Sequence, residues 1–95
     1  MYARVSTAQV QPGRIDEYLS MVEGMKPEFN KIPGVVTYYQ LMDRETHKGI
    51  SIGIYESEAA ATAASSKMQE LGGRVAHLLV LETVSREYFE VSLTR

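Results

Sequence analysis

The order of strand-like and helix-like segments predicts an α+β fold, with a four-stranded antiparallel sheet and helices on one face. Two observations carry this prediction. Four segments are β-rich or alternate between apolar and other residues, and the segments between them repeat apolar residues every three or four positions, as amphipathic helices do. The chain of 95 residues has room for a single domain, residues 1–95.

The first strand and first helix meet at a clear turn signal. Tyr2–Val10 is β-rich and stops at Gln11-Pro12-Gly13. From residue 15 to residue 32, apolar side chains then recur at helical spacing. Pro27 interrupts this pattern, because proline lacks an N–H donor and clashes with the preceding turn. We therefore expect a kink or short break near residues 24–26.

Two further strands flank the polar hairpin connection Asp43–Gly49. The strand Val35–Met42 has apolar residues on both faces, so its pattern leaves open which face covers the core. The strand from Ile50 to Tyr55 places three isoleucines on one face and two small residues with a tyrosine on the other. A strand face lined by small groups often borders a cavity, so we expect one beside this strand.

The second helix begins at a sequence signal and ends at glycines. Ser57 stands where an N-cap hydroxyl would, and an alanine run follows. The helix is predicted from about Ser57 to Leu71, with a break at Gly72-Gly73 and a second short helical piece from Val75 to about Leu81. Alternation over Glu87–Leu93 predicts the last strand.

The resulting order, βαββαβ, is that of a ferredoxin-like fold with both helices on one sheet face. The other face would expose more apolar surface than a stable monomer leaves in water. We therefore expect a homodimer in which two sheets pack face to face as a dimeric α+β barrel, each half keeping a cavity between sheet and helices.

Composition excludes several kinds of protein. An apolar fraction of 44%, a charged fraction of 23% and a formal charge of -2 predict neither a nucleic-acid nor a membrane partner. The absence of cysteine excludes disulfides and thiolate chemistry. The first ten residues are unlike a signal peptide, and the longest apolar run, Leu78–Leu81, is too short to span a bilayer. We expect a cytoplasmic protein.

Three segments carry a resemblance to a known family. They are VQPG at Val10–Gly13, IPGVVTYYQL at Ile32–Leu41 and YESEAA at Tyr55–Ala60. In their order and spacing they resemble the antibiotic biosynthesis monooxygenase-like domains of the dimeric α+β barrel superfamily, over nearly the whole chain. The resemblance implies a small homodimer that oxidises an electron-rich aromatic or quinone-type molecule with dioxygen and no bound cofactor.

Some members of that superfamily degrade haem, and the resemblance argues against this activity here. Their strand-one asparagine corresponds to about Ser6, and their helical tryptophan to about Ala64. Their histidine ligand falls nearest Arg74, three positions short of His77. Alanine cannot shape a haem pocket as tryptophan does.

Few residues of the sequence are candidates for catalysis or substrate binding. His77 is the candidate proton acceptor, because histidine is the residue type that most often takes up and releases protons in enzymes, although a packing role at a helix end is the alternative. Tyr38, Tyr39 and Tyr55 are candidate substrate contacts that would hydrogen-bond a phenolic or quinone oxygen, with a core role as the alternative. Asn30 is a candidate amide partner, or a cap. No metal spacing is present, so neither metal nor cofactor is predicted.

Function divides into three hypotheses. The first is a monooxygenase that orients a small aromatic molecule, and the second is a non-catalytic ligand-binding or stress-associated homodimer of the same fold. The third, an isomerase or dehydratase, requires an acid-base pair that the sequence does not clearly offer. In the first, Tyr55 is predicted to mark the cavity mouth, and the Gly72-Gly73 break to bring His77 to the same space.

Overall fold

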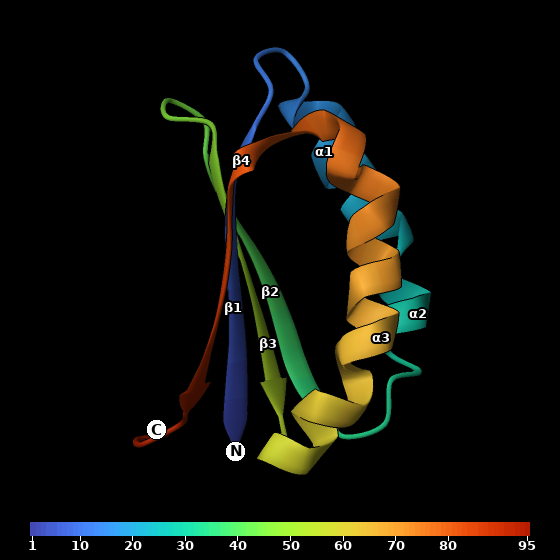
Figure 1. Cartoon of the computed structure of the whole chain (residues 1–95), viewed down its shortest axis with the longest axis vertical. Coiled ribbons are helices and arrows are strands. Elements are labelled where there is room, and N and C mark those ends of the chain that lie inside the picture. Colours follow the sequence, from blue (N-terminus) through green and yellow to red (C-terminus); the bar gives the residue numbers. More distant parts are fainter.

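The computed structural model describes residues 1–95 as one sheet covered by helices on a single face (Figure 1). The four antiparallel strands have the order β2-β3-β1-β4, which confirms the predicted fold class. In chain order the elements are β1 (Tyr2–Val10), α1 (Ile15–Gly24), α2 (Lys26–Phe29), β2 (Val35–Asp43), β3 (Lys48–Tyr55), α3 (Glu58–Val75), the 3-10 turn η1 (Ala76–Leu78) and β4 (Leu79–Glu90).

The first helical region divides where the proline pattern predicted. Helix α1 ends at Gly24, and α2 begins at Lys26 with Pro27 in its first turn, where a missing N–H is tolerated. The apolar side of this region enters a core of 13 buried residues, among them Ile15, Met25 and Phe29. The break therefore lets two short helical pieces follow the twisted sheet.

Helix α3 confirms its predicted start but not its predicted end. The Ser57 hydroxyl accepts a hydrogen bond from the Ala60 N–H at 3.1 Å, as an N-cap should. The predicted break at Gly72-Gly73 is wrong, because the helix runs through both glycines to Val75. A helical glycine costs only about 1 kcal/mol, and the buried stripe of α3 continues past the pair and holds the helix against the sheet.

Strand β4 is longer than its alternation suggested. It spans Leu79–Glu90, so the prediction of helix up to about Leu81 and of a strand over Glu87–Leu93 is wrong in both respects. The register explains the error, since Thr7 pairs with Ser85 whereas Gln9 pairs with Val80. The extra residues interrupt the two-residue period that a regular strand would show.

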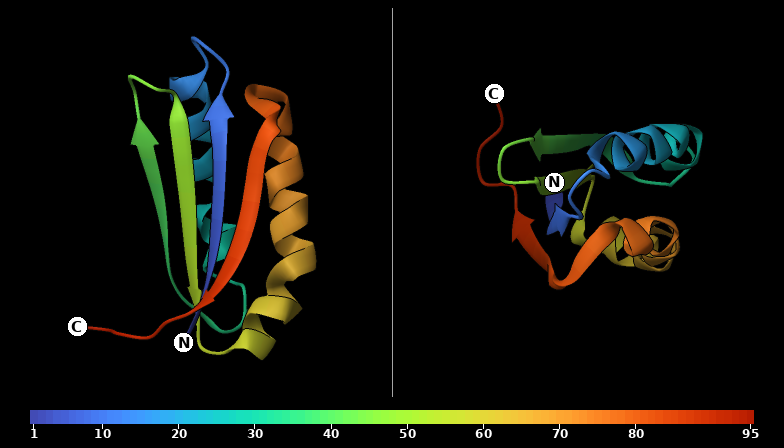
Figure 2. Two further views of the ribbon diagram at one scale, coloured as in Figure 1. Left: turned by 60° about the vertical axis from the view of Figure 1, so that its left-hand side comes forward. Right: turned by 90° about the horizontal axis from the view of Figure 1, so that it is seen from above.

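The two faces of the sheet differ sharply. The helices cover one face, and the other is uncovered in both views of Figure 2. On the uncovered face, which we call the outer face, β2 exposes Tyr39 by 55% and Leu41 by 46%, and β4 exposes Phe89 by 48%. The isoleucines of β3 lie on this face between them. No helix of the chain has the length and apolar character needed to cross a membrane.

Candidate functional site

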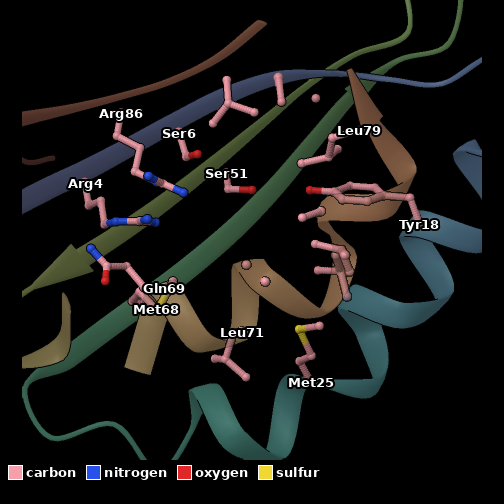
Figure 3. A pocket seen from close by; sticks show the side chains of 18 of the residues that line it. Arg4, Ser6, Tyr18, Met25, Ser51, Met68, Gln69, Leu71, Leu79 and Arg86 are labelled. Atoms are coloured by element: carbon pink, nitrogen blue, oxygen red, sulfur yellow. The ribbon is translucent and has the colours of Figure 1, made fainter. Parts of the chain in front are cut away.

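A cavity of about 270 Å³ lies between the sheet and the helices (Figure 3). We call it the sheet–helix cavity. Of its 21 lining residues, 13 are hydrophobic, and all four strands contribute to it. Small residues open it on the sheet side, and they are Ser6, Ala8, Gly49 and Ser51. Of the predicted small-residue face of β3, Ser51 borders the cavity, whereas Gly53 and Tyr55 do not.

Helix α3 leaves space on the opposite wall. Gly72 and Gly73 both line the cavity, and a Cβ added at either would meet no heavy atom within 4 Å. The glycine pair thus removes side chains from a helix wall that passes directly over the sheet. The two glycines therefore widen the cavity. They do not end the helix, as the sequence pattern had suggested.

An aromatic pair closes one side of the cavity. The rings of Phe29 and Tyr38 stack with centroids 4.3 Å apart and an interplanar angle of 16°. Burial raises the pKa of the Tyr38 phenol, and the positive charge of Arg4 opposes this effect. Tyr38 therefore stays protonated at neutral pH, and its phenol is a hydrogen-bond donor there.

A second phenol belongs to a hydrogen-bonded group at the same wall. The Tyr18 hydroxyl donates to the side-chain oxygen of Gln40 at 3.1 Å, and the Ser51 hydroxyl donates to the same oxygen at 2.7 Å. The Gln40 amide in turn donates to the Leu41 carbonyl at 2.9 Å. Burial raises the pKa of Tyr18 as well. Tyr18 and Ser51 line the cavity, but each gives its single hydroxyl proton to Gln40, so toward a ligand each can only accept a hydrogen bond.

Two arginines supply the charge of the cavity. Arg4 is only 6% exposed, and its Nε is buried without a hydrogen-bond partner. Arg86 extends from the edge strand β4 beside it, and both side chains point into the cavity in Figure 3. No aspartate, glutamate or histidine is among the lining residues.

The predicted site residues are only partly brought together. Tyr38 lines the sheet–helix cavity, whereas Tyr39 is exposed on the outer face. Tyr55 is 1% exposed within the core, its hydroxyl lying against Gly53, and it is not among the residues that line the cavity. The unbroken helix leaves His77 exposed on η1, outside the cavity lining, with its backbone carbonyl accepting a bond from the Gln11 amide at 3.1 Å.

Asn30 lies in a different hollow. It lines a groove of about 420 Å³ between the first helical region and β2, which Tyr38 also borders. The side chain of Asn30 is exposed there. Tyr38 is thus the one predicted contact that both hollows share. The binding roles of all four predicted contacts, and the proton-acceptor role of His77, stay predictions.

The positions that correspond to a haem site are occupied by other interactions. Ala64 is buried in the core, and Arg74 forms ion pairs with Glu28 and Glu70 on the outside of the helices. Ser6 alone of the three lines the cavity. No group of three or more histidine, aspartate or glutamate side chains gathers closely enough to hold a metal ion.

Sequence reasoning missed the arginines and Tyr18. Arg4 shares a strand face with Ser6 and Ala8, so alternation alone places its charge on the cavity side of β1. Arg86 could not be found in this way, because the irregular register of β4 precedes it. In the sequence, Tyr18 is one of the apolar residues that recur at helical spacing. Its hydroxyl reaches Gln40 only because the helix packs against the sheet.

Comparison with known proteins identifies the fold. No protein-family model matches the sequence, and no curated protein is a significant match to it. A provisionally named antibiotic biosynthesis monooxygenase from Nitrosomonas europaea is similar in structure, with a TM-score of 0.81 and 14% identity over 98% of this chain and 100% of that one. SnoaB from Streptomyces nogalater, a cofactor-independent oxygenase solved as its N63A mutant, has a TM-score of 0.79 and 18% identity over 98% and 94% of the two chains.

A third similar structure comes from Deinococcus radiodurans and is also provisionally named an antibiotic biosynthesis monooxygenase. Its TM-score is 0.80, with 9% identity over 100% of this chain and 96% of that one. These identities are low, whereas the shared architecture covers nearly every residue. The chain therefore has the ferredoxin-like fold of the antibiotic biosynthesis monooxygenase structures, which is the fold that its sequence motifs resemble.

Proposed function

We propose that the protein is a small cofactor-independent monooxygenase that acts on an aromatic or quinone-type molecule in the sheet–helix cavity. The observation that carries the proposal is the composition of this cavity, where an aromatic pair and apolar side chains meet hydroxyl and guanidinium donors. SnoaB, a cofactor-independent oxygenase with the same fold, supports it. Such a site suits a flat molecule that carries ring oxygens.

In this reaction the protein would bind the substrate and stabilise the negative charge that develops on it. A substrate carbon that is activated by a neighbouring ring carbonyl loses a proton to solvent water, since the cavity lining contains no carboxylate or imidazole, and the resulting enolate transfers electrons to dioxygen. One oxygen atom replaces two hydrogens of that carbon as a new carbonyl, and the other leaves as water, so the electrons balance without an external reductant. Arg4 and Arg86 would favour the enolate through their positive charge, and the Tyr38 hydroxyl would donate a hydrogen bond to one of its ring oxygens.

Oxygen uptake tests this proposal. Anthrone, which has such an activated carbon, should be converted to anthraquinone with one atom of label from ¹⁸O₂, faster than without protein. Gly72→Leu should suppress the reaction, because it places a larger side chain in the cavity wall. Gly24→Leu is the matched control, since its added Cβ also meets open space but Gly24 does not line the cavity. Equal rates with and without protein would refute the proposal.

The second candidate function is a non-catalytic ligand-binding protein. One observation favours it, namely that the cavity lining contains no aspartate, glutamate or histidine that could act as a base. His77, the predicted proton acceptor, is exposed outside this lining. A binding protein would hold anthrone without oxidising it faster than buffer does, and the His77→Ala variant would leave its affinity for anthrone unchanged.

We also propose that the protein is a homodimer through its outer face. The exposed apolar side chains of β2 and β4 support this, since such a contiguous patch is unfavourable in water. Sedimentation should give twice the chain mass, and Leu41→Lys should yield monomers. Leu93→Lys is the matched control, because Leu93 is 89% exposed beyond the last strand. A monomeric wild-type protein at micromolar concentration would contradict the dimer.

A further inference from the structure

The feature that the proposed chemistry does not fully explain is a buried, unpaired arginine. Arg4 is 6% exposed, and none of the side-chain hydrogen bonds or ion pairs of the chain involves it. The Nε–H of this guanidinium is a buried donor without a partner, and one such donor costs about 1–3 kcal/mol. Arg4 therefore has unused capacity to bind an anion.

The strand register places a second arginine within reach of the same anion. Arg4 pairs directly with Tyr88, and Arg86 is two residues from Tyr88 on the same strand and so on the same face. Diagonal neighbours of this kind are about 7–8 Å apart at Cα, a separation that two long side chains span easily. Figure 3 shows both guanidinium groups directed to the same part of the cavity.

The surroundings offer no internal counter-charge. The cavity lining contains no carboxylate, and no ion pair engages Arg86. Arg86 is exposed on the edge strand, whereas Arg4 lies deeper. The two arginines therefore lie between solvent and the interior of the cavity. The apolar side chains of Met25, Phe29 and Leu71 form another part of its wall.

We propose that Arg4 and Arg86 form a carboxylate subsite, so that the natural ligand of the cavity is an aromatic carboxylic acid. Two guanidinium forks match the two oxygens of one carboxylate and form charge-assisted hydrogen bonds with them. The aromatic ring then lies against the apolar wall, with its ring oxygens toward the Tyr38 hydroxyl. This inference rests on the proposed function for the identity of the cavity as the substrate site, but binding alone tests it.

The test compares probes that differ only in charge. Calorimetric titration under nitrogen should show 2-naphthoate binding about tenfold to a hundredfold more tightly than 2-naphthamide, the range expected of hydrogen bonds to a charged group. Arg4→Met and Arg86→Gln should each remove most of this preference while leaving naphthamide affinity unchanged. Arg95→Gln, at the exposed C-terminus, is the matched control for lost surface charge and should leave the preference intact.

The outcomes separate this inference from the proposed activity. Arginine-dependent naphthoate binding without any oxidation of anthrone supports the carboxylate subsite and refutes the monooxygenase. Anthrone oxidation combined with equal affinities for naphthoate and naphthamide refutes the subsite and leaves the monooxygenase standing. A naphthoate preference that survives in Arg86→Gln and in Arg4→Met overturns the subsite. Because Arg86 is exposed, its variant tests the subsite even where Arg4→Met fails to fold.

Discussion

A carboxylate subsite built around a buried arginine predicts that binding and stability oppose each other at Arg4. Arg4→Met should stabilise the ligand-free protein, because it keeps an apolar stem of similar length and removes the unpartnered Nε. Leaving one buried donor unsatisfied costs about 1–3 kcal/mol. The side chain borders an existing cavity, so its shortening adds little new void. We expect a net gain of about 1–2 kcal/mol, and each kcal/mol should raise Tm by about 4–8 °C.

Urea and thermal unfolding at one fixed protein concentration measure this effect, since the stability of a dimer depends on concentration. Arg86→Met is the matched control, because Arg86 is exposed and its guanidinium is already solvated. Its unfolding free energy should change by less than about 0.5 kcal/mol. Arg4→Met unfolding at a lower urea concentration than wild type, with an unchanged slope, would refute the reasoning that Arg4 is held at a cost.

Four further predictions follow from particular groups. Gly72→Ala should raise the unfolding free energy by about 0.5–1 kcal/mol, since the added Cβ meets open space; a loss of helix stability in urea unfolding would contradict this. Burial raises the pKa of Tyr18 and Tyr38 above the ordinary 10.0, so the stability they contribute is present below pH 10 and falls as pH rises further; ultraviolet titration should find tyrosines that ionise late, and finding none would be inconsistent with their burial. The hydrogen bond from Arg74 and the contact with Lys67 lower the pKa of Glu28 below 4.5, so its contribution is present above that value and is lost as pH falls. Glu28→Gln should therefore lose less stability than wild type on acidification, and parallel pH profiles would rule this out. Haem added with reductant and oxygen should keep its Soret band, because Ala64 is buried in the core and Arg74 is engaged in ion pairs; catalytic loss of the band would overturn that expectation.

Local sequence signals determined most of the architecture. The turn after Val10, the proline at residue 27 and the Ser57 cap each act within one or two turns of chain, and the structure places element boundaries beside all three. The end of α3 was not predictable in this way. Its glycines are weak local breakers, and the packing of Leu71 and Val75 against the sheet outweighs them.

The candidate site depends more on tertiary structure than the fold does. Tyr38 was identified as an aromatic on a strand, but only pairing with β3 shows that it faces inward while Tyr39 faces outward. Arg86 follows an irregular register that no alternation pattern reveals. The significance of Arg4 lies in the absence of a partner, which is a property of the folded chain and not of its sequence.

A crystal structure of the protein with bound 2-naphthoate tests the central claim, that the sheet–helix cavity is the ligand site, most directly. The account predicts the naphthalene ring beside Phe29 and Leu71, with its carboxylate within hydrogen-bond distance of both Arg4 and Arg86. Naphthoate bound on the outer face, in the groove beside Asn30, or in the cavity with its carboxylate away from both arginines would contradict it.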